Sequence, residues 1–263
     1  MNQKCFRFFL ILVLLLILFL SACASVQSTS TATLTLAATS TPEPTAKNTS
    51  TPTATQTPSP TGTPDFVATQ QYADFTSMVQ MFYEAGYIST TVGQYVVLDD
   101  YQDELASKLA YARAETGLIA KNFIIRADFE WSNAINTVNI SGCGFIYRMQ
   151  QNQDHYIIIL DAFSGVKLAS HTDKGTSSMG SPQNGDQTTS DFGPNPYQAA
   201  FTLIVNELKT YVYINDVYYG EYDLLEHRII DSGGLAVAVL SATSEGYGTR
   251  CKMTNVRVWV IDH

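Results

Sequence analysis

The stretch that decides the fold lies at the end of the chain and reads Tyr247-Gly-Thr-Arg-Cys-Lys-Met-Thr-Asn-Val-Arg-Val-Trp-Val-Ile-Asp262. Its second half alternates with the period of a β-strand. One face would carry Val256, Val258 and Val260, and the opposite face Asn255, Arg257 and Trp259. Cys251 precedes this alternation, and its plausible partner is Cys143, in a strand-like run far upstream. A bond between them predicts that the end of the chain closes a sheet begun much earlier.

The other end of the chain is typical of a secretory signal. Lys4 and Arg7 precede an unbroken apolar run from Phe8 to Leu20, which is too short for a comfortable membrane span of about 20 residues. Leu20-Ser-Ala-Cys23 follows and resembles the lipobox of bacterial lipoproteins, in which the cysteine is lipidated. We expect residues 1–22 to be a lipoprotein signal peptide and Cys23 to anchor the protein to a membrane, facing out of the cytoplasm.

This placement bears on the remaining cysteines. Cys5 would leave with the signal, so Cys143 and Cys251 remain for an oxidising compartment, where a disulfide is the default. No cluster of Cys and His has the spacing of metal ligands. Asp99-Asp100 is an acidic pair, but Ca²⁺ takes about 6–8 oxygen ligands, so the sequence supports no cofactor.

The charge of the chain excludes some partners. The formal net charge is −9, and loss of Lys4 and Arg7 makes it −11. An acidic chain without Lys/Arg clusters is not typical of nucleic-acid binding or of adhesion to anionic lipid.

Composition divides the rest of the chain. Residues 23–63 are mostly Ser, Thr, Pro and Ala, which predicts a disordered stalk. Residues 64–86 carry an apolar helical stripe, with Thr63 as N-cap and Gly86 as the C′ residue, and predict an amphipathic helix. Residues 87–263 alternate with period two and predict an all-β sandwich. The strands expected there are Gln94–Leu98, Lys108–Ala114, Phe123–Trp131, Gly144–Met149, His155–Asp161, Val166–Ser170, Ala200–Val205, Thr210–Ile214, Tyr218–Leu224, Gly234–Leu240 and Lys252–Val260.

The order of these segments resembles a known superfamily. The segments are Phe123-Ile-Ile-Arg-Ala-Asp-Phe-Glu-Trp, Cys143-Gly-Phe-Ile-Tyr-Arg, His155-Tyr-Ile-Ile-Ile-Leu, Tyr211-Val-Tyr-Ile-Asn-Asp and Met253-Thr-Asn-Val-Arg-Val-Trp. They resemble concanavalin A-like lectins and glucanases, including laminin-G-like and 3-keto-glucoside hydrolase-like domains, over roughly Tyr87 to Asp262. The resemblance implies a jelly roll of two curved antiparallel sheets whose concave face often meets saccharide.

One segment matches a catalytic pattern of that superfamily. Glu221-Tyr-Asp-Leu-Leu-Glu226 reads E-x-D-x-x-E, which in laminarinase-type glucanases implies Glu221 as nucleophile and Glu226 as acid/base, with Asp223 between them. The alternative is an acidic, solvated strand face, which the missing tryptophan-rich surroundings favour.

Alternation supplies a second candidate. If Ala127, Phe129 and Trp131 face the core, the neighbouring polar side chains point the other way. Should the strands be neighbours, one outward face would then carry Arg126, Asp128, Glu130, Arg148 and His155. Such a set could hydrogen-bond sugar hydroxyls, and the alternative is charge pairing on a wet sheet.

The sequence thus favours a lipid-anchored surface protein with a non-catalytic sandwich that binds extracellular polysaccharide or glycoconjugate. A glycoside hydrolase using Glu221, Asp223 and Glu226 is one alternative. A structural or protein-adhesion module is the other.

Overall fold

The structure is a computed structural model and describes residues 66–135, 140–163, 165–187, 192–224 and 231–261. All of them belong to the second of two compact units, Gly62–His263. The expected signal peptide and stalk, with Cys23, lie outside the described residues. Within those residues, no helix is both long and apolar enough to cross a membrane.

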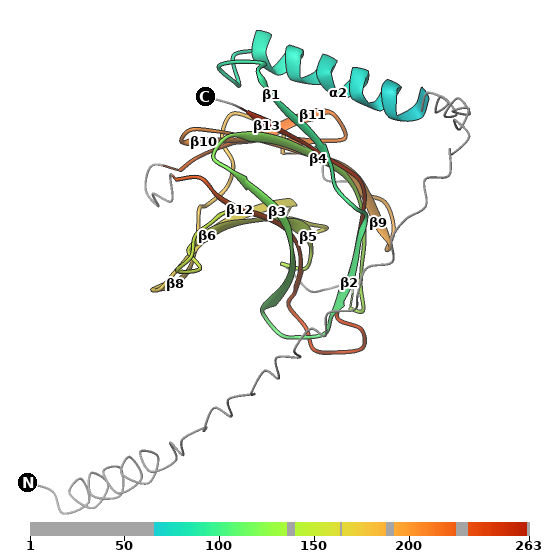
Figure 1. Ribbon diagram of the computed structural model, residues 1–263. Coiled ribbons are helices and arrows are strands. Elements are labelled where there is room, and N and C mark those ends of the chain that lie inside the picture. Colours follow the sequence, from blue (N-terminus) through green and yellow to red (C-terminus); the bar gives the residue numbers. More distant parts are fainter. Residues whose placement is uncertain (1–65, 136–139, 164, 188–191, 225–230, 262–263) are drawn as a thin grey trace, which may run out of the picture. The chain divides into compact units, whose positions relative to one another are not determined.

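The described residues form two antiparallel sheets with one helix on the outside (Figure 1). The larger, sheet A, has the order β1-β13-β4-β9-β10-β11, with β2 also paired to β13, and sheet B has the order β3-β12-β5-β6-β7-β8. The strands are β1 Gly93–Val97, β2 Tyr101–Leu105, β3 Ala110–Ala120, β4 Phe123–Asn133, β5 Gly142–Met149, β6 His155–Asp161, β7 Gly165–Thr172, β8 Gly175–Ser178, β9 Tyr197–Asn206, β10 Lys209–Ile214, β11 Val217–Asp223, β12 Gly233–Ser241 and β13 Thr249–Ile261. In Figure 1 the sheets are nested arcs, so the outer face of sheet A is convex and that of sheet B concave. The expected sandwich is confirmed.

The expected strands are present, mostly with small shifts of their ends. The largest difference is β3, which extends to Ala120, six residues past its expected end at Ala114. The structure adds β2 and β8, which the sequence analysis missed. Both are short and lack a fully buried residue, so neither carries a strong apolar alternation.

The last strand alternates as expected, but around a bulge. Its pairing with β4 shifts register between Thr254 and Arg257, where Asn255 has a φ of 54°. The bulge lets Met253 and Val256, three residues apart, both face the core between the sheets. Val258 follows them inward, whereas Trp259 is buried on the opposite face.

Helix α2, Phe66–Glu84, covers that opposite face of sheet A (Figure 1). Its buried stripe of Phe75, Val79 and Phe82 packs on a patch formed by Ile124, Ile204, Trp259 and Ile261. Gly86 follows the helix with a φ of 79°, as expected of a C′ glycine. The helix therefore occupies part of the outer face of sheet A and leaves the remainder open.

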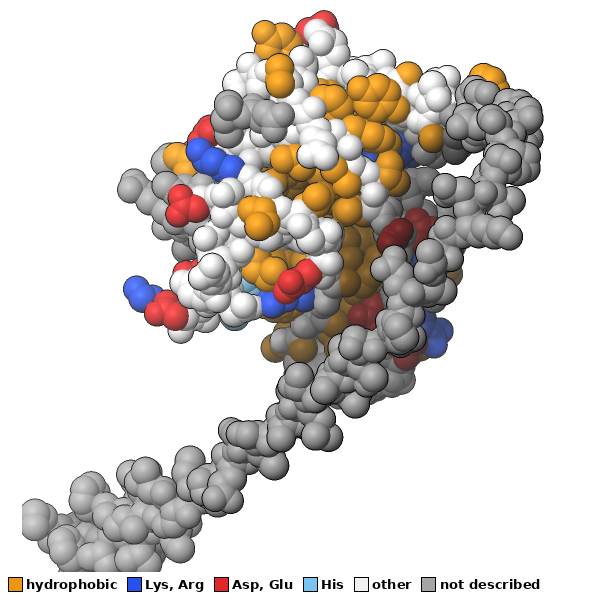
Figure 2. Space-filling model, in the orientation of Figure 1, with side chains coloured by type: hydrophobic (Ala, Val, Ile, Leu, Met, Phe, Trp, Pro, Cys, Tyr) orange, Lys and Arg blue, Asp and Glu red, His pale blue; other side chains and the backbone are white. Residues whose placement is uncertain are grey.

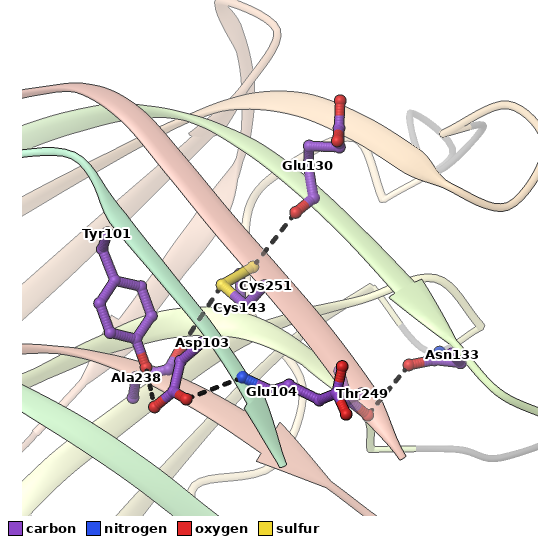
Figure 3. Close-up of a disulfide and its surroundings, with 9 residues drawn as sticks. All are labelled: Tyr101, Asp103, Glu104, Glu130, Asn133, Cys143, Ala238, Thr249 and Cys251. Atoms are coloured by element: carbon purple, nitrogen blue, oxygen red, sulfur yellow. Dashed lines mark hydrogen bonds between the residues drawn. A yellow bond between two sulfur atoms is a disulfide. The ribbon is translucent and has the colours of Figure 1, made fainter. Parts of the chain in front are cut away.

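A disulfide joins Cys143 and Cys251, as predicted, with Cα atoms 5.5 Å apart (Figure 3). Cys143 lies on β5 of sheet B and Cys251 on β13 of sheet A, so the bond crosses the core and links the two sheets. Both cysteines are buried in the main hydrophobic cluster. The bond therefore fastens one sheet to the other and does not tie neighbouring strands within a sheet.

Replacing Cys143 and Cys251 together with alanine should lower the free energy of unfolding by roughly 2–5 kcal/mol, because the unfolded chain is freed of a cross-link over 108 residues. Urea unfolding of the oxidised wild type and the double variant measures the loss. Non-reducing mass spectrometry should find the two cysteines bonded in the wild type. Free thiols there, or equal unfolding midpoints, would contradict this assignment.

Candidate functional site

The five predicted ligand-binding residues do not share one face. Arg126, Asp128 and Glu130 lie on β4 in sheet A, whereas Arg148 and His155 belong to β5 and β6 in sheet B. The condition that these strands are neighbours holds for β5 and β6 but not for β4, because alternation fixes the face of a strand but not the sheet that contains it. The set therefore divides into three separate environments.

The three residues of β4 lie on the open part of the outer face of sheet A. Their cross-strand neighbours form rows that run away from the helix: Ile124 with Ile204 and Trp259, then Arg126 with Thr202 and Arg257, then Asp128 with Ala200 and Thr254, then Glu130 with Gln198 and Lys252. The first row is buried beneath α2, whereas in the following rows every side chain except that of Thr202 is partly or fully exposed. The side chains thus change from apolar to polar where the helix cover ends.

The last two rows line a groove of about 410 Å³, here called the outer groove. Its polar lining comprises Asp128, Glu130, Gln198, Asn215, Lys252 and Thr254. This volume is within the range of small-molecule sites, roughly 300–1,000 Å³. Sequence reasoning found the two carboxylates but missed the other four residues, because strand register brings Gln198, Lys252 and Thr254 alongside β4 and Asn215 comes from the β10–β11 turn.

Hydrogen bonds orient the carboxylates of the outer groove. Asn255 Nδ2 donates to Asp128 Oδ2 at 2.7 Å, and Gln198 Nε2 donates to Glu130 Oε2 at 3.0 Å. Each carboxylate keeps a second oxygen as an acceptor. Within the described part of the chain, Lys252 is in no ion pair, so its ammonium group is available as a donor. The groove therefore offers both acceptors and donors for hydroxyl groups.

Arg126 stands beside the groove and is engaged already. Its guanidinium is paired with the Asp216 carboxylate, through one close contact and a second from Nη2 to Oδ2 at 3.1 Å, and it donates to Thr202 Oγ1 at 3.1 Å. Figure 2 shows acidic and basic side chains scattered in small groups over the face that it presents, without a broad basic patch.

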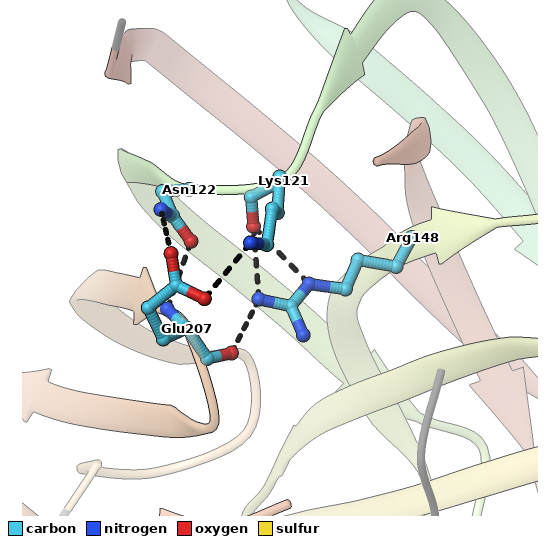
Figure 4. Close-up of polar contacts among 4 residues, drawn as sticks. All are labelled: Lys121, Asn122, Arg148 and Glu207. Atoms are coloured by element: carbon cyan, nitrogen blue, oxygen red, sulfur yellow. Dashed lines mark hydrogen bonds and ion pairs between the residues drawn. The ribbon is translucent and has the colours of Figure 1, made fainter. Parts of the chain in front are cut away.

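Arg148 is fully buried and has a structural role, which corrects the expectation that it points outward. It has a φ of 52° at the end of β5, and its guanidinium donates to the carbonyl of Lys121 at 3.1 and 3.0 Å and to that of Glu207 at 2.5 Å (Figure 4). Burial lowers the pKa of Arg148, and the nearby Glu207 opposes this shift. The side chain thus fastens β5 of sheet B to the β3–β4 connection between the sheets and to the β9–β10 turn of sheet A.

His155 lies on the concave face of sheet B but is also fully buried. Its Nδ1 is 2.6 Å from the Gln153 carbonyl, so Nδ1 carries the hydrogen, and Nε2 accepts from the Tyr111 hydroxyl at 3.1 Å. The imidazole stacks on His171 with centroids 4.9 Å apart. Burial lowers the pKa of His155, with the charges of His171 and Arg113 adding to this and the Gln153 hydrogen bond and Asp154 opposing it.

Of the three carboxylates in the glucanase-like pattern, the structure describes two, Glu221 and Asp223. Glu221 lies on β11, an edge strand of sheet A, where it accepts from Lys209 Nζ at 3.0 Å, Asn184 Nδ2 at 3.2 Å and the Tyr218 hydroxyl at 3.2 Å. Burial acts to raise the pKa of Glu221, but these hydrogen bonds outweigh it and hold the pKa below its ordinary value. Asp223 is exposed, and Glu226 lies outside the described residues. Among the residues described, no three His, Cys, Asp or Glu side chains gather to hold a metal ion.

Comparison with known proteins adds little beyond the sandwich. No protein-family model matches the chain, and no curated protein matches it. Among solved structures, a carbohydrate-binding module, CBM66, from Bacillus subtilis matches at 10% identity with a TM-score of 0.41, over 62% of this chain and 94% of its own. A fructosyltransferase from A. japonicus matches at 14% identity with a TM-score of 0.42, over 68% of this chain and 28% of its own. A β-glucanase from Bacillus licheniformis matches at 9% identity with a TM-score of 0.40, over 58% of this chain and 71% of its own. Likeness at this level carries no argument about ligand or activity.

The environment of His155 predicts a pH dependence of stability. Its pKa in the folded protein lies below the ordinary value of 6.5, so the unfolded chain binds the proton more strongly. The contribution of His155 to the free energy of unfolding is therefore fully present above pH 6.5, and it is lost as the pH falls from there towards the pKa of the folded state. Urea unfolding of the wild type between pH 7.5 and roughly pH 5 should show this decline, and His155→Gln should reduce its slope. Equal slopes in the two proteins would show that His155 is not its source.

Proposed function

We propose that this protein is a lipid-anchored extracytoplasmic protein whose β-sandwich binds carbohydrate or glycoconjugate in the outer groove, without catalysis. The observation that carries the proposal is the set of Asp128, Glu130, Gln198, Asn215 and Lys252 around one groove on a rigid sheet. Sugar hydroxyls both donate and accept hydrogen bonds, so they match a lining of carboxylates, amides and an ammonium group.

Pre-formed geometry supports binding in this groove. Asp128 and Glu130 stand on a strand hydrogen-bonded on both sides, and Asn255 and Gln198 hold their carboxylates in place. A ligand would therefore spend little of its binding free energy on ordering these side chains.

The non-catalytic part of the proposal rests on Glu221. Its three donors keep the carboxylate ionised and occupied, and Lys209 also approaches Asp223 at 4.0 Å. This arrangement favours an ion pair that supports the edge strand over a nucleophile free to attack.

A glycan array tests binding in the outer groove. Full-length protein in detergent should bind a subset of glycans, and Asp128→Asn combined with Glu130→Gln should abolish or strongly weaken that binding. The matched control is Asp173→Asn with Glu245→Gln, which removes the same charge from two exposed positions elsewhere. Loss of binding in the control, or no loss in the groove variant, would refute the assignment.

The anchoring part of the proposal rests on Leu20-Ser-Ala-Cys23 before the polar stalk. Cys23→Ala should release the protein from membranes or leave its signal uncleaved, because the lipid acceptor is gone. Lipid labelling and membrane fractionation measure this. Unchanged labelling and partitioning of the variant would refute the lipobox assignment.

A further inference from the structure

A second groove of about 610 Å³ lies at one end of sheet B, between the β5–β6 turn and the start of β12. We call it the turn groove. Its polar wall is formed by Gln150, Gln151, Asn152, Asp154 and Ser232, and its apolar side by Ile119 and Met149. It shares no lining residue with the outer groove, which lies on the other sheet.

The turn that forms this wall is rigid. Gln150 N donates to the Asp154 carbonyl at 2.8 Å, and Asn152 and Asp154 exchange two further hydrogen bonds at 2.9 and 3.1 Å. Gln150 Nε2 donates to the carbonyls of Arg148 and Ser232 at 2.9 and 3.3 Å, so it joins the two sides of the groove. Such a wall is formed before any ligand arrives.

Unused polar groups line this rigid wall. The exposed side chains of Gln151 and Ser232 are not used in any hydrogen bond between described residues that holds the turn together. These two side chains are therefore available to hydrogen-bond the hydroxyl groups of a ligand.

The lining also indicates the charge of the ligand. Among the described residues, no lysine or arginine lines the groove, because Arg148 turns its guanidinium inward to the Lys121 and Glu207 carbonyls. Asp154 and Asp231 disfavour an anion. Ile119 is 72% exposed on the rim and, with Met149, offers an apolar surface to the C–H face of a sugar ring.

We propose that the turn groove is a second binding site, for a neutral saccharide. The inference rests on the carbohydrate class of the proposed function but not on the outer groove. The amide group of Gln151 would donate to and accept from sugar hydroxyls, and the hydroxyl group of Ser232 could do the same.

The test measures binding of neutral hexasaccharides of β-1,3-glucan, α-1,4-glucan, xylan, mannan and levan to the full-length protein by calorimetry. At least one probe should bind. Ser232→Trp, which fills the groove, should raise the Kd for that probe by about tenfold or more. Gln151→Ala, at an exposed position that can hardly affect folding, should weaken the same probe. The matched control is Ser177→Trp at an exposed serine of β8.

The outcomes separate the two sites. Binding retained in Asp128→Asn/Glu130→Gln but weakened in Ser232→Trp supports the turn groove. Binding lost only in the outer-groove variant overturns the turn groove and leaves the proposed function standing. No binding of any probe, or equal weakening by Ser177→Trp, also overturns the turn groove, while the glycan array still tests the outer groove on its own.

Discussion

The bond between Cys143 and Cys251 crosses the core between two strands that are interior to their sheets. β13 pairs with β1, β2 and β4 in sheet A, and β5 lies between β12 and β6 in sheet B. Arg148 makes a second connection, from β5 to the carbonyl of Lys121 in the β3–β4 connection and to that of Glu207 in a turn of sheet A. A covalent link and a buried cation thus fix the separation of the sheets at two points.

On the outer face of sheet A, strand β4 both packs against the helix and lines the outer groove. Along β4, Ile124 is covered by α2, while Asp128 and Glu130 two and three steps of alternation later line the outer groove. The helix removes from water the apolar patch around Trp259 that would otherwise be exposed. Because the helix covers only the apolar rows, the polar rows remain accessible.

The sequence predicted those features that depend on local pattern. Alternation identified most strands and the faces of β4, and the count of cysteines in a chain expected to be exported identified the disulfide. Arg148 was misplaced because a positive φ at the end of β5 redirects its side chain, which no alternation rule anticipates. Lys252 and Gln198 were missed because their approach to Glu130 depends on the pairing of β13 and β9 with β4. Register and sheet membership are long-range properties, so periodicity alone cannot supply them.

Two saccharide sites on one rigid frame would have a consequence for the length of the ligand. A polymer long enough to reach from the outer groove to the turn groove would bind the second site at a high effective concentration. A short oligosaccharide would occupy either groove alone and dissociate at the rate of that single site. Weak individual contacts, typical of open grooves on a sheet surface, would then still retain a long polysaccharide. Selection by chain length would follow from the fixed placement of the two grooves, without any further contact to the sugar.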